Sequence, residues 1–232
     1  MIFPNFKTEL ELYNSGYCFV AGCDEVGVGP LAGPVVAAAC ILDPGAIGKQ
    51  RGKNKWYYRV RDSKTTDEKE RARLLPEIME HCIAFGIGKC SPEQIDSLNI
   101  HHATLLAMKI AFEDLAQKLA VVPKPAEVAV KDSIYLILDG RFTIKDLQCD
   151  NFRLDQRAMI NADQNVLSVS AASIIAKEHR DAILRKMDFE FPGYGFSRHK
   201  GYNTKEHKQA IQRLGITVHH RKSFLKNFNL VF

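Results

Sequence analysis

Apolar residues occur in runs separated by polar turns, and the longest such stretch extends from Cys18 to Leu42. It is interrupted by two adjacent carboxylates, Asp24 and Glu25, and then by a turn rich in glycine. This pattern predicts two strands with an acidic tip and a turn between them. Neighbouring side chains of a strand point to opposite faces, so only one of the two carboxylates can point directly into a given site.

Three later runs predict further strands. Residues 83–89 form a short apolar run interspersed with glycine. Residues 133–139 are almost continuously apolar and end in Asp139 and Gly140, as expected for a central strand covered on both faces. The stretch around 156–163 predicts a fifth strand or a sheet edge.

The segments between these strands predict helices. One begins near Ser63 or Thr65, either of which can cap it, and continues to Cys82. A second has Pro92 in its first position. A third carries apolar residues at alternating three- and four-residue steps, which is the stripe of a helix that faces a core. The residues of this stripe are Leu105, Met108, Phe112, Leu115 and Leu119.

The last third of the chain predicts two more helices. Ser168 and Ser170 can cap a helix whose first turns are small and apolar, and a further helix is predicted over 205–214. The order of elements predicts a mixed-sheet α/β domain over 1–188 and a C-terminal helical appendage over 189–232. A chain of 232 residues is long enough for one large domain with such an addition.

Composition excludes several classes of protein. The six cysteines never form a Cys-x-x-Cys pair and lie mostly in apolar runs, which favours reduced, buried thiols over a disulfide framework or a zinc site. The first residues lack the basic and apolar regions of a signal peptide, and no apolar run approaches the ~18 residues of a membrane span. We therefore expect a cytoplasmic protein with no membrane association. We also expect it to be a monomer.

Positive charge is concentrated in two blocks. The net charge is +5, but residues 49–73 carry ten Lys and Arg against four acids, and residues 177–226 carry twelve against five. The rest of the chain is therefore acidic. Two basic blocks beside an acidic body indicate a polyanionic partner, most commonly nucleic acid, although two solvated basic faces would give the same count.

Four acids stand out by position. Asp24 and Glu25 follow the first strand, Asp139 closes the fourth, and Asp163 precedes a helix. Converging carboxylates repel one another and stay ionised together when cations neutralise them, and hard divalent metals suit carboxylate and water ligands. With basic blocks to hold a polyanion, this set indicates two-metal phosphodiester hydrolysis.

Two further segments can be interpreted in more than one way. Gly27, Gly29 and Gly33 let the main chain approach a ligand closely, but a tight hairpin with two solvated acids would have the same composition. The basic, aromatic segment Lys49 to Tyr58 suits contact with a phosphate backbone. Its tryptophan could instead fix a loop to the body of the protein.

At the level of motifs, the chain resembles ribonuclease HII, the type 2 ribonuclease H family, from Ala21 to about Lys226. Each motif alone is weak, and their order and spacing make the resemblance specific. The matching pieces are Gly22-x-Asp-Glu-x-Gly-x-Gly-Pro-Leu-Ala-Gly-Pro-Val-Val-Ala-Ala-Ala39, Asp62-Ser-Lys64, Leu98-Asn-Ile-x-His-Ala-Thr104, Leu138-Asp-Gly140, Ser170-Ala-Ala-Ser-Ile-Ile-Ala-Lys177, Tyr194-Gly-Phe196, His199-Lys-Gly-Tyr202 and His219-His-Arg221.

The resemblance implies a ribonuclease H-like fold with a five-stranded mixed sheet flanked by helices. It assigns Asp24, Glu25, Asp139 and Asp163 as catalytic acids that bind two Mg²⁺ or Mn²⁺ ions. It also implies that the substrate is RNA paired with DNA, including single ribonucleotides within duplex DNA. Hydrolysis on the 5′ side of the ribonucleotide would leave 3′-hydroxyl and 5′-phosphate ends.

The resemblance also implies a set of substrate-binding residues. Backbone groups of the Gly27-Val28-Gly29 loop would contact the 2′-hydroxyl, and Tyr202 would stack on the neighbouring sugar. Lys177 could contact the nucleic-acid backbone or form a structural ion pair. The remaining residues assigned to backbone contact are Ser63, Lys64 and Arg221.

The sequence departs from the family at the glycine loop, which usually reads Gly-Arg-Gly. Val28 keeps the main chain but removes a positive charge, so weaker binding or altered junction preference is expected. The surroundings of Asp163 also lack the usual basic, glycine-containing pattern. Three alternatives stay open at this point: a ribonuclease HIII, a binder of hybrids without catalysis, and a DNA-directed nuclease of the same superfamily.

Overall fold

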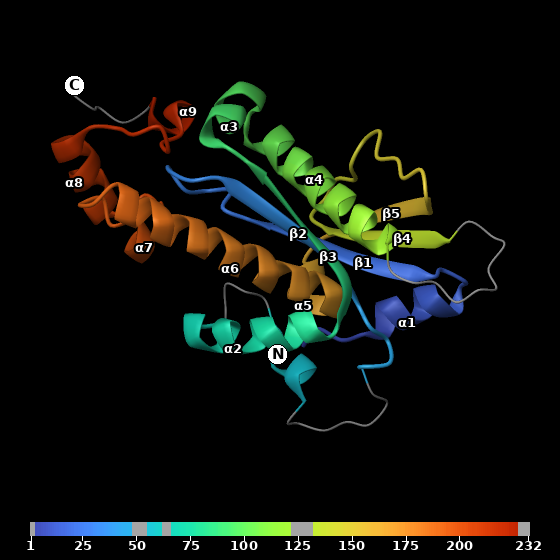
Figure 1. The fold of residues 1–232 in the computed structure, drawn as a ribbon. Coiled ribbons are helices and arrows are strands. Elements are labelled where there is room, and N and C mark those ends of the chain that lie inside the picture. Colours follow the sequence, from blue (N-terminus) through green and yellow to red (C-terminus); the bar gives the residue numbers. More distant parts are fainter. Residues whose placement is uncertain (1–2, 48–54, 62–65, 122–131, 227–232) are drawn as a thin grey trace.

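The protein is described by a computed structural model that places residues 3–47, 55–61, 66–121 and 132–226. These residues form one mixed sheet with helices on both faces, followed by short C-terminal helices (Figure 1). The strands are β1 Phe19–Val26, β2 Val35–Leu42, β3 Cys82–Cys90, β4 Ser133–Asp139 and β5 Arg153–Met159. The helices are α1 Lys7–Asn14, η1 Trp56–Tyr58, α2 Glu68–Glu80, α3 Pro92–Leu98, α4 Ile100–Ala120, α5 Ala162–Asn165, α6 Leu167–Glu190, α7 Phe196–His199, α8 Lys205–Leu214 and α9 Lys222–Leu225.

The sheet has the order β3-β2-β1-β4-β5. β1, β2 and β3 are antiparallel neighbours, whereas β4 and β5 run parallel to β1. The fold class expected from the sequence, an α/β ribonuclease H-like sheet of five strands flanked by helices, is thus confirmed in its architecture. The parallel arrangement also brings the carboxyl ends of β1, β4 and β5 to one end of the sheet, where sites commonly form in α/β proteins.

Each face of the sheet is covered by a long helix (Figure 1). The stripe on α4, including Met108, Phe112 and Leu115, packs on one face, and α6 with α2 covers the other. β2 is buried along its whole length, which explains its continuous apolar sequence. At Gly22, a Cβ atom would lie 2.3 Å from the backbone of Ser168, so glycine is what allows α6 to lie directly on β1.

Two expected helix starts are wrong. α2 begins at Glu68, and its N-cap is Asp67, whose side chain accepts a hydrogen bond from the backbone N–H of Glu70 at 2.8 Å. α6 begins at Leu167, so Ser168 and Ser170 lie inside the helix and cap nothing.

The cap of α6 comes from a distant part of the chain. Glu9 of α1 accepts a hydrogen bond from the backbone N–H of Ser168 at 2.8 Å. Leu167 donates from its backbone N–H to the carbonyl of Asn5 at 3.1 Å. The helix dipole favours a carboxylate at this helix end, and the burial of Glu9 opposes its ionisation more strongly.

The aromatic part of the segment 49–58 is fixed to the body. Residues 49–54 lie outside the described part, but the Trp56 ring is buried and stacks on His81 with ring centroids 5.3 Å apart. Tyr57 is also buried, whereas Tyr58 is partly exposed. Of the two readings of this segment, the structure supports the attachment of the loop by tryptophan.

The C-terminal helices pack against the end of α6 and the loop between β1 and β2. Phe196 and Ala210 share an apolar cluster with Leu184 of α6, and Leu225 packs with Leu31. The expected boundary after residue 188 falls in the last turn of α6, so this helix belongs to both predicted parts.

Candidate active site

The register of β1 and β4 brings two of the four predicted acids together. Cys23 pairs with Leu138 in this parallel ladder, which places Asp24 of β1 beside Asp139 at the end of β4. Asp24 lies on the face covered by α6, as does Gly22 two residues earlier. Glu25 therefore starts from the opposite face, in agreement with the alternation expected from the sequence.

Asp163 is brought to the same end of the sheet by the turn after β5. Asn161 takes a left-handed conformation with φ 56°, and the chain then enters the short helix α5. The Oδ1 atom of Asp139 accepts hydrogen bonds from the backbone N–H groups of Ala162 at 2.7 Å and Asp163 at 3.5 Å. The Ser170 hydroxyl donates to the Asp163 carbonyl. The structure thus brings all four acids to one end of the sheet.

The surroundings of Asp24 are unfavourable for a negative charge. Asp24 is fully buried, and burial together with the neighbouring carboxylates of Glu25 and Asp139 raises its pKa well above the usual range. Its Oδ1 atom accepts a hydrogen bond from the Glu25 backbone N–H at 2.7 Å, but its buried Oδ2 atom has no hydrogen-bond partner in the described residues. A cation is the group that this oxygen and the neighbouring charges fit.

The acids do not form a closed metal cage. No group of three or more His, Cys, Asp or Glu side chains in the described ranges is arranged to hold a metal ion. This arrangement is compatible with Mg²⁺ or Mn²⁺, because Mg²⁺ is commonly held by one or two carboxylates together with water and substrate phosphate oxygens. The donor set therefore fits a hard divalent ion that is shared with a phosphate substrate.

The glycine loop and Tyr202 lie side by side. A Cβ atom added to Gly29 would lie 3.8 Å from Cε1 of Tyr202. The Leu31 backbone N–H also donates to the carbonyl of Gly201 at 2.8 Å. Tyr202 is 46% exposed and Val28 is 39% exposed, so both side chains are accessible at this junction.

A pair of buried histidines supports the Tyr202 turn. Nδ1 of His220 accepts a hydrogen bond from the Thr217 backbone N–H at 2.9 Å, so neutral His220 carries its proton on Nε2. This proton faces Nε2 of His207 at 3.2 Å, and Nδ1 of His207 lies 2.9 Å from the Tyr202 carbonyl. Burial is the main cause that lowers the pKa of each histidine from 6.5 to about 4.

Two residues assigned to the phosphate backbone are held by other groups in the structure. The Lys177 side chain is 16% exposed and pairs with Asp181 one turn later on α6. Burial lowers its pKa, and the hydrogen bond to Asp181 opposes that shift. Arg221 is fully buried among backbone carbonyls. Ser63 and Lys64 lie outside the described residues.

Sequence reasoning missed Arg180, which supports the same loop. It is fully buried on α6 and donates to the carbonyls of Ala32, Pro34 and Lys200 at 3.0 to 3.2 Å. The available signal was its place on an i, i+4 stripe of α6 whose other members are apolar. That stripe consists of Ala172, Ala176, Arg180 and Leu184.

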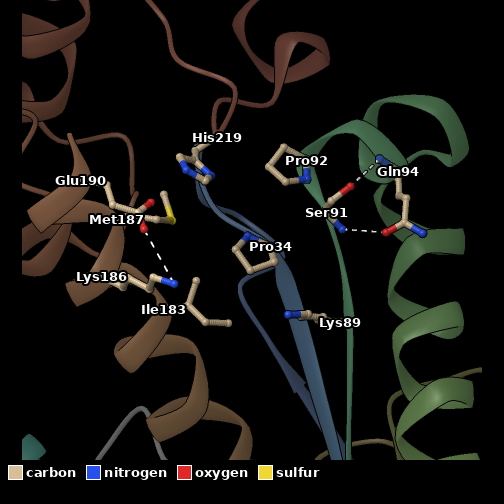
Figure 2. A pocket seen from close by; sticks show the side chains of 10 residues that line it. All are labelled: Pro34, Lys89, Ser91, Pro92, Gln94, Ile183, Lys186, Met187, Glu190 and His219. Atoms are coloured by element: carbon tan, nitrogen blue, oxygen red, sulfur yellow. Dashed lines mark hydrogen bonds and ion pairs between the residues drawn. The ribbon is translucent and has the colours of Figure 1, made fainter.

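A cavity of about 410 Å³ lies between the end of β3 and α6. Figure 2 shows Pro34 at its centre, His219 and Lys89 at opposite ends, and Met187 on the side of α6. None of the predicted site residues lines it. The cavity is therefore not part of the predicted site.

The family profile for ribonuclease HII matches residues 21–227. The ribonuclease HII of Vibrio vulnificus strain YJ016 is 43% identical over 212 residues, which are 91% of this chain and 88% of that protein. The chain belongs to the ribonuclease HII family. This confirms the resemblance, the fold and the activity class expected from the sequence, a hydrolytic endoribonuclease that acts on RNA/DNA hybrids.

Solved structures agree with the ribonuclease HII fold. The crystal structure of ribonuclease H2 from Pyrococcus horikoshii OT3 has a TM-score of 0.60 at 22% identity and covers 88% of this chain and 93% of that one. A Bst-RNase HIII in complex with Mn²⁺ has a TM-score of 0.57 at 19% identity, covering 94% and 73%. The fold is therefore shared with ribonuclease HIII, and the curated relatives at 42–43% identity are named ribonuclease HII. No helix in the described ranges is long and apolar enough to cross a membrane.

Proposed function

We propose that this ribonuclease HII cleaves on the 5′ side of ribonucleotides, including single ribonucleotides embedded in duplex DNA, and leaves 3′-hydroxyl and 5′-phosphate ends. The observation that carries the proposal is the position of the four acids beside an accessible junction of the glycine loop with Tyr202. Carboxylates for phosphodiester chemistry and main-chain groups for sugar recognition are thus found together.

Asp24, Glu25, Asp139 and Asp163 would hold the divalent ions. When bound, two such ions supply an activated water and stabilise the leaving 3′-oxygen. The buried, unpartnered Oδ2 atom of Asp24 supports this assignment, as does the crowding of negative charge around it. Both Mg²⁺ and Mn²⁺ suit these ligands, and the Mn²⁺ complex of a fold neighbour supports divalent metal dependence.

Asp139 and α5 fix one another, which defines a second role for this acid. Its Oδ1 atom accepts the two amide hydrogen bonds of α5 and is thereby oriented. Asp139 is thus ready to act as a ligand while it keeps Asp163 in place.

Recognition of the ribonucleotide would use the glycine loop and Tyr202. The loop offers backbone groups to the 2′-hydroxyl, which is the chemical difference between RNA and DNA. The exposed Tyr202 ring stands against the loop at Gly29 and can stack on the next sugar. We further propose that the enzyme acts in the cytoplasm as a monomer, as expected from its sequence.

The test is a labelled DNA duplex with one ribonucleotide, incubated with Mg²⁺ or Mn²⁺. Incision immediately 5′ of the ribonucleotide is expected, with no cleavage of an all-DNA duplex of the same sequence. The Asp139→Asn variant should cleave neither duplex. If a long RNA/DNA hybrid were cleaved but the single-ribonucleotide duplex were not, the proposal would hold for hybrids only. Cleavage of the all-DNA duplex would reject ribonucleotide recognition.

A further inference from the structure

Three segments that are distant in the sequence meet at the glycine loop. They are the loop itself at 27–34, the turn at 199–202 and the segment at 217–221. Gly33 donates from its backbone N–H to the His219 carbonyl at 2.9 Å, and Arg221 donates from its backbone N–H to the Leu31 carbonyl at 2.8 Å. The position of the glycine loop therefore depends on the C-terminal appendage.

The Arg221 side chain is the most highly bonded group at this meeting point. Its Nη1 donates to the Val28 carbonyl at 2.8 Å, and its Nη2 donates to the carbonyls of Gly27 at 2.6 Å and Gly33 at 2.9 Å. Nε also donates to Gly33, at 3.0 Å. The residue has no exposed surface, so its guanidinium is not accessible to a phosphate in this conformation.

These bonds determine where the next amides point. In a trans peptide the C=O and the following N–H lie in one plane and point in opposite directions, and no described peptide is cis. With the carbonyls of Gly27 and Val28 turned towards Arg221, the N–H groups of Val28 and Gly29 are directed away from it. Neither N–H donates a hydrogen bond within the described part of the chain.

The backbone of the loop requires both glycine and arginine here. Gly27 has φ +91°, and a Cβ atom at this position would lie 2.2 Å from Nε of Arg180. A second buried arginine thus packs behind the loop, while Arg221 bonds its carbonyls. A planar guanidinium can serve several carbonyls at fixed angles, which the single ammonium of a lysine cannot do.

We propose that Arg221 is a positioning residue for ribonucleotide recognition, which holds the Gly27 and Val28 carbonyls inward and so presents the Val28 and Gly29 amides to the sugar of the substrate. This inference rests on the proposed function. It replaces the sequence-based assignment of Arg221 to the phosphate backbone, because the same side chain cannot make both sets of contacts without leaving the loop.

The test compares binding of two duplexes that differ only in one 2′-hydroxyl. Binding is measured in the Asp139→Asn background, with Ca²⁺ present, at 50 to 200 mM KCl. Arg221→Lys is expected to reduce the preference for the ribonucleotide duplex about tenfold and to leave the affinity for all-DNA duplex unchanged. Arg221→Gln is expected to leave the salt dependence of all-DNA binding unchanged, because the charge that it removes does not contact phosphate.

Leu225→Ala is the matched control. Leu225 is buried and packs on Leu31 of the same junction, but its side chain makes no hydrogen bond to the loop. The stabilities of Leu225→Ala and Arg221→Lys are compared through their urea midpoints. At equal stability, Leu225→Ala should keep the preference for the ribonucleotide duplex. Equal loss of preference in both variants would show that Arg221 has only a structural role and would overturn the proposal.

A measurement on the unaltered loop covers the case in which Arg221→Lys does not fold. In ¹⁵N-labelled Asp139→Asn protein, the amide signals of Val28 and Gly29 should shift with the ribonucleotide duplex and stay in place with all-DNA duplex. Identical shifts with both duplexes would contradict the proposal. So would a lower salt dependence in Arg221→Gln, which would indicate direct phosphate contact. If wild-type protein failed to cleave any ribonucleotide duplex, the proposed function itself would fail instead.

Discussion

At the scale of single residues, Asp24 combines a catalytic assignment with a cost in stability. The carboxyl is buried beside Glu25 and Asp139, and one of its oxygens has no partner in the described residues. Without a bound cation, such a group disfavours the folded state. The same carboxyl becomes favourable once a divalent ion binds it.

Asp24→Asn should therefore inactivate the enzyme and stabilise it at the same time. We expect activity to fall by about 10³-fold or more, because a charged group at the reacting phosphate is lost. In EDTA, the melting temperature should rise by several degrees, for a gain of about 1–2 kcal/mol. Thermal melts in EDTA measure the stability, and cleavage of the ribonucleotide duplex with Mg²⁺ measures the activity. A variant less stable than wild type in EDTA would show that the buried Asp24 carboxylate does not destabilise the folded protein.

Val28→Arg tests the departure from the family's usual loop. Val28 is partly exposed next to the Tyr202 junction, so an arginine can reach a phosphate there. We expect tighter binding of the ribonucleotide duplex and a salt dependence steeper by about 0.9 in log–log slope, the value for one added phosphate contact. Val28→Gln, which has no charge, is the control. Unchanged affinity and slope in Val28→Arg would disprove this account of the loop.

At the scale of elements, local patterns predicted the strands and the long helices but not α1 or the caps of α2 and α6. The stripe on α4 and the apolar run of β4 depend on neighbours in the chain, so their spans could be predicted. The start of α6 could not, because its cap is Glu9, which is separated from Ser168 by 159 residues. Helix caps that come from another element leave no local signal.

The Glu9 contact predicts a pH effect on stability. Burial raises the pKa of Glu9 from 4.5 to about 7 in the folded protein. The folded state therefore keeps a proton that the unfolded state releases between these values, and this contribution to stability decreases as pH rises from about 4.5 to 7. One pKa unit corresponds to about 1.4 kcal/mol, so the full change in the free energy of unfolding is about 3 kcal/mol.

Glu9→Gln removes this titration and keeps an oxygen that can accept from Ser168. From pH 5 to pH 8, its urea midpoint should gain relative to that of wild type. Glu11→Gln, on the exposed side of α1, is the control and should show no such change. If the wild-type and Glu9→Gln midpoints changed in parallel, the raised pKa of Glu9 would be refuted.

At the scale of the whole molecule, the C-terminal appendage contains a buried pair of histidines whose neutral forms are favoured. The His207–His220 pair is buried, and the pKa of each is lowered to about 4. Below pH 6.5 the unfolded chain binds protons that the folded pair does not, so stability is lost as pH falls from about 6.5 towards 4. This sign is opposite to that of Glu9.

His207→Asn should reduce the acid sensitivity of the molecule. The asparagine amide can still donate to the Tyr202 carbonyl but cannot titrate. Between pH 7 and 5, wild type should lose on the order of 1–2 kcal/mol more than the variant. Urea midpoints at the two pH values measure this difference. An equal loss in both proteins would assign the acid sensitivity to other groups.

The candidate site was only partly predictable at this scale. The acids could be placed because strand ends and spacing indicate them, and Tyr202 because a motif contains it. The surroundings of Arg221 and Lys177 could not, since a basic residue has the same appearance in the sequence whether it faces solvent or a row of carbonyls. Burial of a charge is decided by segments that meet only in the folded chain.

Trp56 is the only tryptophan in the sequence, and it stacks on His81 at the end of α2. Its fluorescence therefore reports on one site rather than on an average over the protein. Emission from native enzyme follows the attachment of residues 55–60 to α2, without any added label. Titration with nucleic acid would show directly whether this segment stays docked when substrate binds at the other end of the sheet.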